Sequence, residues 1–144
     1  MSVYAISEEL NGELELHCKH NTLGEFFSSL PQQPYHGDYT IGWYNHSKYR
    51  AVHYHFCSAI TKLNMDKLNG FDERYALGVG FDDNELIVRI GRLGLKKSIN
   101  DNISAIHQFH PYVCHKIQNA GEFLAKNRNL LNSVTKKEIT YRAN

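Results

Sequence analysis

Residues 82–93 read DDNELIVRIGRL, and this stretch predicts the clearest helix of the chain. Acidic side chains occupy its first turn and basic ones its second half, an order that the helix macrodipole favours. Leu86, Ile90 and Leu93 recur at helical spacing and predict one buried face. Gly94 follows and is expected to end the helix.

Helical and extended patterns are mixed on both sides of this helix. We expect one or two short strands in residues 2–16, and strands over 52–60 and 103–109. We expect further helices over 23–30, 61–69 and 117–131. Thr22 and Glu25 match a capping box, which marks a helix start. The pattern predicts an α/β fold with residues 1–144 in a single domain.

Length and charge exclude several classes of protein. The chain has 144 residues, 42% of them hydrophobic, and 16 lysines and arginines nearly balance 15 aspartates and glutamates. A net charge of +1 without a basic cluster argues against a nucleic-acid partner. No apolar run approaches the roughly 18 residues of a transmembrane segment. Three cysteines and no leader predict reduced thiols and a cytoplasmic or membrane-peripheral protein.

Residues 32–50 are polar and aromatic, with Trp43 near the middle. They have no clean period, so we expect a long surface loop or a ragged strand. Exposed aromatic rings among small polar residues would suit stacking on sugar rings. Packing of these rings on the core is the simpler interpretation of this segment taken alone.

Four carboxylates lie close together in sequence, at Asp72, Glu73, Asp82 and Asp83. The second pair opens the predicted helix, where the dipole and free amides favour negative charge. An ionised carboxylate at a pocket mouth can act as a general base toward a hydroxyl. On charge placement alone, capping of the helix is the simpler interpretation.

Several linked blocks add a resemblance to this pattern. They are GFDE at 70–73, GFDDNEL at 80–86, Arg89 in the helix, and IHQFH at 106–110. Over residues 55–110 the order and spacing of these blocks resemble the C-terminal, galactosyltransferase-like half of GT-A fold glycosyltransferases of the family 2 type. The strand-like residues 54–60 resemble the strand that leads into the first block. The resemblance implies a mixed sheet with flanking helices.

The resemblance also implies roles for individual residues in an inverting hexosyl transfer. Asp83 would be the catalytic base that takes a proton from the acceptor hydroxyl, and Asp82 would bind the acceptor. Two carboxylates, Asp72 and Glu73, would shape the donor-sugar side, and Trp43 is a candidate sugar-binding residue. His107 would be a ligand of a divalent metal, and His110 is the second candidate for that role.

The partners implied are a nucleotide-sugar donor and a glycan acceptor, as in polysaccharide biosynthesis. Mn²⁺ or Mg²⁺ is the expected cofactor, and only with a complete donor site. The family's nucleotide-binding half, which ends in an Asp-X-Asp motif, has no counterpart in this sequence. We therefore expect the chain to be the acceptor-and-base half, incomplete as an enzyme on its own, with a separate or missing donor half.

Two other functions stay open at this point. A non-catalytic carbohydrate-binding or interaction module would use the aromatic segment around Trp43. A metal-binding module would use His107, His110, Cys114 and His115, although their spacing matches no familiar zinc finger.

Overall fold

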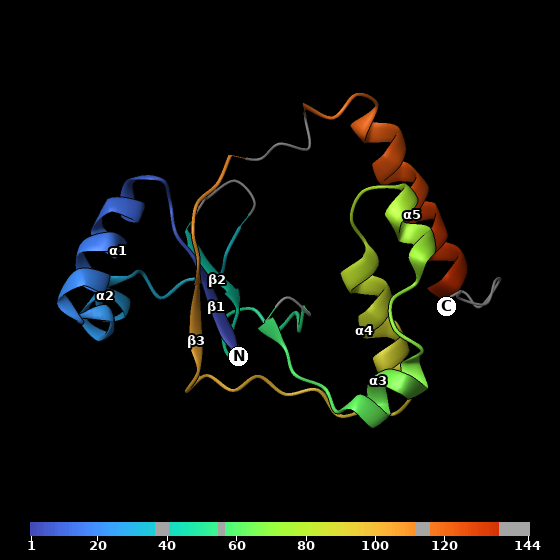
Figure 1. Cartoon of the computed structure of the whole chain (residues 1–144), viewed down its shortest axis with the longest axis horizontal. Coiled ribbons are helices and arrows are strands. Elements are labelled where there is room, and N and C mark those ends of the chain that lie inside the picture. The colour runs from blue at the N-terminus through green and yellow to red at the C-terminus, as the bar shows by residue number, and fades with distance from the viewer. Residues whose placement is uncertain (37–40, 55–56, 112–115, 136–144) are drawn as a thin grey trace. The chain divides into compact units, whose positions relative to one another are not determined.

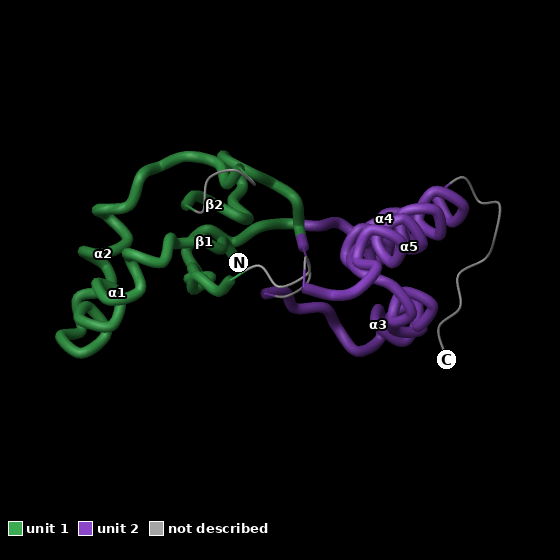
Figure 2. The backbone as a smooth tube through the Cα atoms, turned by 90° about the horizontal axis from the view of Figure 1, so that it is seen from above, with its two compact units in different colours: residues 1–53, 98–111 green, residues 54–97, 112–144 purple. Residues whose placement is uncertain are grey.

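The computed structural model describes residues 1–36, 41–54, 57–111 and 116–135. The chain divides into two compact units (Figure 2). Unit 1 comprises residues 1–53 and 98–111, and unit 2 comprises residues 54–97 and 112–144.

The predicted mixed α/β class is confirmed (Figure 1). Unit 1 contains β1 (Ser2–Ala5), α1 (Glu9–His20), α2 (Leu23–Ser29), β2 (Gly42–Asn45) and β3 (Ser104–His107). Unit 2 contains α3 (Lys62–Leu68), the 3₁₀ helix η2 (Glu73–Leu77), α4 (Asp82–Arg92) and α5 (Ala120–Thr135). Within the described residues, none of these helices has the length and apolarity to cross a membrane.

The sheet of unit 1 has the order β2-β1-β3, so β1 is its central strand. β1 runs antiparallel to β2, with Tyr4 opposite Trp43, and parallel to β3, with Tyr4 opposite Ile106. All four residues of β1 are buried, as expected of a central strand that is covered on both faces.

One apolar cluster forms the core of unit 1. Its buried members come from the sheet, from the two helices and from the segments that flank them, and they are Tyr4, Ile6, Leu14, Phe26, Leu30 and Trp43. Each large apolar side chain buried in this way contributes about 1.5–3 kcal/mol. Helices α1 and α2 lie side by side over this cluster (Figure 1).

Two local predictions in unit 1 are only partly right. The extended pattern predicted for residues 2–16 holds for β1 alone, because residues 9–20 form α1. Leu10 and Leu14 are four residues apart, and Leu14 is buried against the core, so tertiary packing selects the helix. The helix after Thr22 is confirmed, but the Thr22 hydroxyl makes no capping bond and contacts His17 Nδ1 at 2.7 Å.

The strand predicted for residues 52–60 is also wrong for its described residues, 52–54 and 57–60, which form none. His55 and Phe56 lie outside the described residues. A strand forms instead within the aromatic segment, as β2, where β1 offers backbone groups to pair with. Strand preference depends on such pairing and burial more than on residue type.

Unit 2 follows the predicted helices closely. The predicted helices over 61–69, 82–93 and 117–131 are α3, α4 and α5 with slightly different ends. The side chain of Thr61 caps α3 by accepting from the Asn64 amide, and Asn69 ends it in the left-handed region at φ 57°. Helix α4 buries Leu86 as expected, but it also buries Glu85 and Arg89, and Leu93 is 40% exposed.

Candidate active site

The acidic pair Asp82 and Asp83 forms the first turn of α4. Both side chains are partly buried, and the helix dipole favours negative charge at this end. The N-cap residue of α4 is Phe81, which makes no side-chain capping bond, so the two aspartates act on the helix as first-turn charges and not as N-caps.

The backbone that leads into this pair is unusual. Gly80 and Phe81 both have positive φ, at 66° and 69°. Glycine adopts this region freely, but a bulky residue such as phenylalanine does so at a conformational cost of the order of 1–3 kcal/mol. Such a conformation persists only where neighbouring groups hold it, and it reverses the chain direction immediately before the two aspartates.

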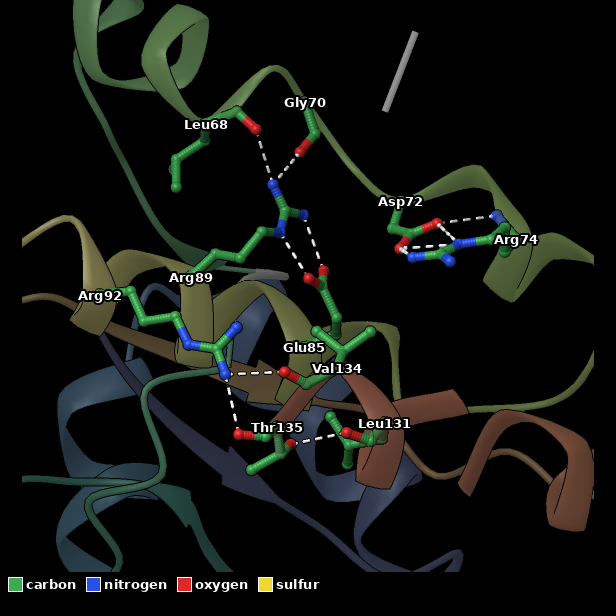
Figure 3. Close-up of polar contacts among 10 residues, drawn as sticks. All are labelled: Leu68, Gly70, Asp72, Arg74, Glu85, Arg89, Arg92, Leu131, Val134 and Thr135. Carbon is green, nitrogen blue, oxygen red and sulfur yellow. Dashed lines mark hydrogen bonds and ion pairs between the residues drawn. The ribbon is translucent and has the colours of Figure 1, made fainter. Parts of the chain in front are cut away.

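A buried ion pair lies within α4, and its arginine also bonds to the backbone at the end of α3 (Figure 3). The Arg89 guanidinium donates to both carboxylate oxygens of Glu85, at 2.6 and 2.7 Å, and both side chains are at most 4% exposed. Its remaining terminal nitrogen donates to the carbonyl oxygens of Leu68 at 2.7 Å and Gly70 at 2.8 Å. Arg89 therefore ties the end of α3 and the start of the Gly70–Glu73 block to the helix of the acidic pair.

The Asp72 carboxylate is occupied by local bonds. It accepts from the Arg74 amide at 3.1 Å and from the Arg74 guanidinium, at 2.9 Å from Nε, and its side chain is fully buried. This pairing raises the pKa of Arg74 above its already high ordinary value. Asp72 therefore begins η2 and fixes its first turn. Glu73, the first residue of η2, is exposed.

The other three predicted site residues belong to unit 1. Trp43 is only 7% exposed, packs edge-on against Tyr4 and donates its indole N–H to Gln32 Oε1 at 3.0 Å. It is a core residue, which leaves little of its ring for a sugar. His107 ends β3, and His110 follows in an exposed position with its ring centroid 5.2 Å from that of His107.

The described residues do not by themselves make the expected divalent metal site. Within ranges 1–36, 41–54, 57–111 and 116–135, no three histidine, cysteine, aspartate or glutamate side chains gather around a point. Two imidazoles without carboxylates are a poor set for Mn²⁺ or Mg²⁺, which prefer oxygen ligands. Cys114 and His115, the other half of the alternative metal module, lie outside the described residues.

The buried pairing of Glu85 with Arg89 was not predicted from the sequence, although both residues lie in the resembling blocks. Glu85 and Arg89 are four residues apart, a spacing typical of an exposed ion pair on a helix, and the pair is instead buried. The available signal was their place next to Leu86 and Ile90 on the predicted apolar face. Comparison with known proteins adds nothing to this geometry, because no protein-family model, curated protein or solved structure matches the chain.

Proposed function

We propose that this chain supplies the acceptor-binding and general-base part of an inverting glycosyltransferase with a GT-A fold. A nucleotide-binding half would bring the nucleotide sugar, and this chain would bring the group that activates the acceptor hydroxyl. The proposal combines the resemblance of the linked blocks with the local geometry of unit 2.

The observation that carries the proposal is the position of Arg89. The two blocks that resemble the family, residues 70–73 and 80–86, are joined by this one guanidinium through the Gly70 carbonyl and the Glu85 carboxylate. The arginine of the resembling pattern thus has a physical task, which is to hold the two acidic blocks in a constant relation. A pair of unrelated helix caps would have no need of such a link.

In the proposed reaction, Asp83 accepts the proton of an acceptor hydroxyl as that oxygen attacks the anomeric carbon of the donor sugar. The bond from this carbon to the nucleotide diphosphate breaks, and its electron pair leaves with the phosphate oxygen. One displacement inverts the anomeric centre. Asp82 would accept a hydrogen bond from a second acceptor hydroxyl.

The remaining predicted residues receive narrower roles in this proposal. Asp72 would act by fixing η2, because its carboxylate is bonded to Arg74. Glu73, which is exposed, would contact a hydroxyl of the donor sugar. Trp43 is left out because it is a core residue. No step is assigned to a metal or to His107 and His110.

The test is the substitution Asp83→Asn in the full chain, joined to the nucleotide-binding half of a family 2 glycosyltransferase whose donor is known. Asparagine keeps the shape of aspartate, but it cannot take a proton. We expect transfer to fall by about 10²–10⁴-fold, the usual loss when a general base is removed. The free energy of unfolding should change by only about 0.3–1 kcal/mol, from the lost charge at the helix start.

The matched control is Asp66→Asn, the same change at an exposed carboxylate of α3, which should leave transfer unchanged. Transfer by Asp83→Asn near the level of the unaltered chain would reject the base assignment and leave Asp83 as a charge that stabilises the first turn of α4. Glycan binding without transfer by the joined protein would favour a carbohydrate-binding module instead.

A further inference from the structure

Helix α5 contacts the loop that precedes the acidic pair through one of its faces. The contacts come from Phe123, Leu124, Asn127 and Arg128, which recur with the i, i+4 spacing of a single helix face. The loop, residues 78–81, is the segment with the two consecutive left-handed residues.

Asn127 makes the central contact. It is fully buried, and its side-chain amide donates to the carbonyl oxygens of Tyr75 at 3.0 Å and Gly80 at 2.8 Å. The first carbonyl belongs to η2, three residues before Gly78, and the second belongs to Gly80 within the loop. A single amide group therefore closes the loop from the end of η2 to the entry of α4.

The other contacts act at neighbouring points. The Val79 amide donates to the Phe123 carbonyl at 3.3 Å, and the Arg128 guanidinium lies over the ring of Phe81, 5.5 Å from its centroid. A cation over an aromatic face is attracted to it. Together these contacts hold Val79, Gly80 and Phe81 in turn, up to the residue before Asp82.

Gly78 fits against Asn127 because it has no side chain. A Cβ added at Gly78 would lie 2.1 Å from Asn127 Oδ1, and the three atoms nearest to it all belong to Asn127. The backbone of Gly78 is extended, at φ −145° and ψ −156°, so alanine is sterically acceptable there except for this contact. The glycine and the asparagine are therefore complementary in shape.

We infer that Asn127 is a positioning residue, which fixes the 78–81 loop and thereby the direction in which α4 presents Asp82 and Asp83. The inference deepens the proposed function and rests on it for the catalytic consequence. The structural part of the inference, that one buried amide holds the loop, can be tested without an activity assay.

The first experiment compares amide hydrogen exchange in the full chain and in Asn127→Ala. The reporters are the amides of Val79 and Glu85, bonded to Phe123 and Phe81, and the α3 amide of Met65, bonded to Thr61, is the internal reference. We expect exchange at Val79 and Glu85 to rise at least tenfold relative to Met65, because the loop opens locally. Val134→Ala, a buried change on the same helix, should leave this ratio unchanged.

The second experiment tests the Gly78 contact by a double-mutant cycle. Gly78→Ala should destabilise the unaltered chain, and the same substitution should cost far less in the Asn127→Ala background, where the clashing oxygen is gone. An equal cost in both backgrounds would overturn the contact. An equal rise in exchange at Val79, Glu85 and the reference Met65, or no rise at the two reporters, would overturn the positioning role.

Transfer by the joined protein separates this inference from the proposed function. With both correct, Asn127→Ala lowers kcat and leaves the KM for the nucleotide sugar unchanged, because the donor binds to the other half. If no version of the joined protein transfers sugar, the proposed function fails, and the exchange ratio still decides whether Asn127 holds the loop. If transfer is normal in Asn127→Ala despite local opening, the catalytic consequence is rejected.

Discussion

The two units have interiors of different chemistry. In unit 1 the buried residues are mostly apolar, with Ser2 and Asn45 as the polar exceptions among those described. In unit 2 as many buried residues are polar or charged as are apolar: Asp72, Glu85, Arg89 and Asn127, against Leu68, Tyr75, Leu86 and Val134.

This difference has a physical consequence for specificity. Apolar packing is non-directional and tolerates changes of shape that keep the volume. Buried ions and amides are costly unless each bond is made, so they stabilise one geometry and penalise others. These polar bonds therefore restrict the backbone of unit 2 to one geometry more strictly than its few buried apolar side chains alone would. A site built on the 70–73 and 80–86 blocks requires such a fixed geometry.

The largest loss of stability is expected when the ion pair between Glu85 and Arg89 in unit 2 is broken. Arg89→Met leaves the Glu85 carboxylate buried without its cation and removes the donors to two carbonyls. Breaking such a pair costs about 3–5 kcal/mol. We expect the amides of α4 to lose their protection from exchange, while the emission of Trp43, the single tryptophan and a unit 1 core residue, changes little.

The double variant Glu85→Leu, Arg89→Met is its control. Removing both charges avoids the buried unpaired carboxylate, so this variant should be more stable than Arg89→Met alone. A cost below about 1 kcal/mol for Arg89→Met, at the lower end of single-substitution effects, would remove the contrast between the two interiors.

A smaller effect on stability is expected at Tyr4, the residue of the unit 1 core cluster whose side chain loses a proton in alkali. The Tyr4 hydroxyl donates to the Pro31 carbonyl at 2.6 Å, and burial raises the pKa of Tyr4 to about 12 from its ordinary 10. The unfolded chain therefore loses this proton at lower pH than the folded chain does. Stability from Tyr4 is fully present below pH 10 and declines as the pH rises toward about 12.

The substitution Tyr4→Phe tests whether stability falls with rising pH in this way. It should cost about 1 kcal/mol at neutral pH, the typical value of one hydrogen bond. It should also flatten the loss of stability in alkali, followed by Trp43 emission because that ring contacts Tyr4 edge-on at 5.0 Å between centroids. The same steep loss in the variant and in the unaltered chain would assign the alkaline transition to other groups.

The smallest change in stability is expected at an exposed ion pair of unit 2. Lys62 and Asp66 contact each other at 2.8 Å on α3, with side chains 88% and 57% exposed. Lys62→Ala should change the free energy of unfolding by at most about 0.5 kcal/mol, and salt should reduce even that. A loss comparable to that of Arg89→Met would mean that burial is not what separates the two pairs.

Helix α4 is the element best predicted from its residues. Its charge order and the spacing of Leu86 and Ile90 are local properties, and they specify where a helix begins and ends without reference to the rest of the chain. The sequence places Glu85 and Arg89 beside the apolar face, but their burial also requires the carbonyls of Leu68 and Gly70, which only the folded chain brings to Arg89.

Extended segments were predicted less well for a related reason. Residues 52–60 have the composition of a strand, yet their described part forms none, and Gly42–Asn45 pairs with β1 instead. A strand obtains its hydrogen bonds from another segment, so its composition cannot say whether a partner edge is within reach.

The residues alone were sufficient for the mixed α/β class, the long helices and the acidic pair at the start of α4, since each of these depends on neighbours within a few positions along the chain. Tertiary packing decided that Trp43 is part of the core, that Asp72 is paired with Arg74, and that Arg89 and Asn127 hold the segments around the acidic pair. These outcomes depend on burial and on bonds between groups far apart in sequence, whose free energy exists only after the chain has folded.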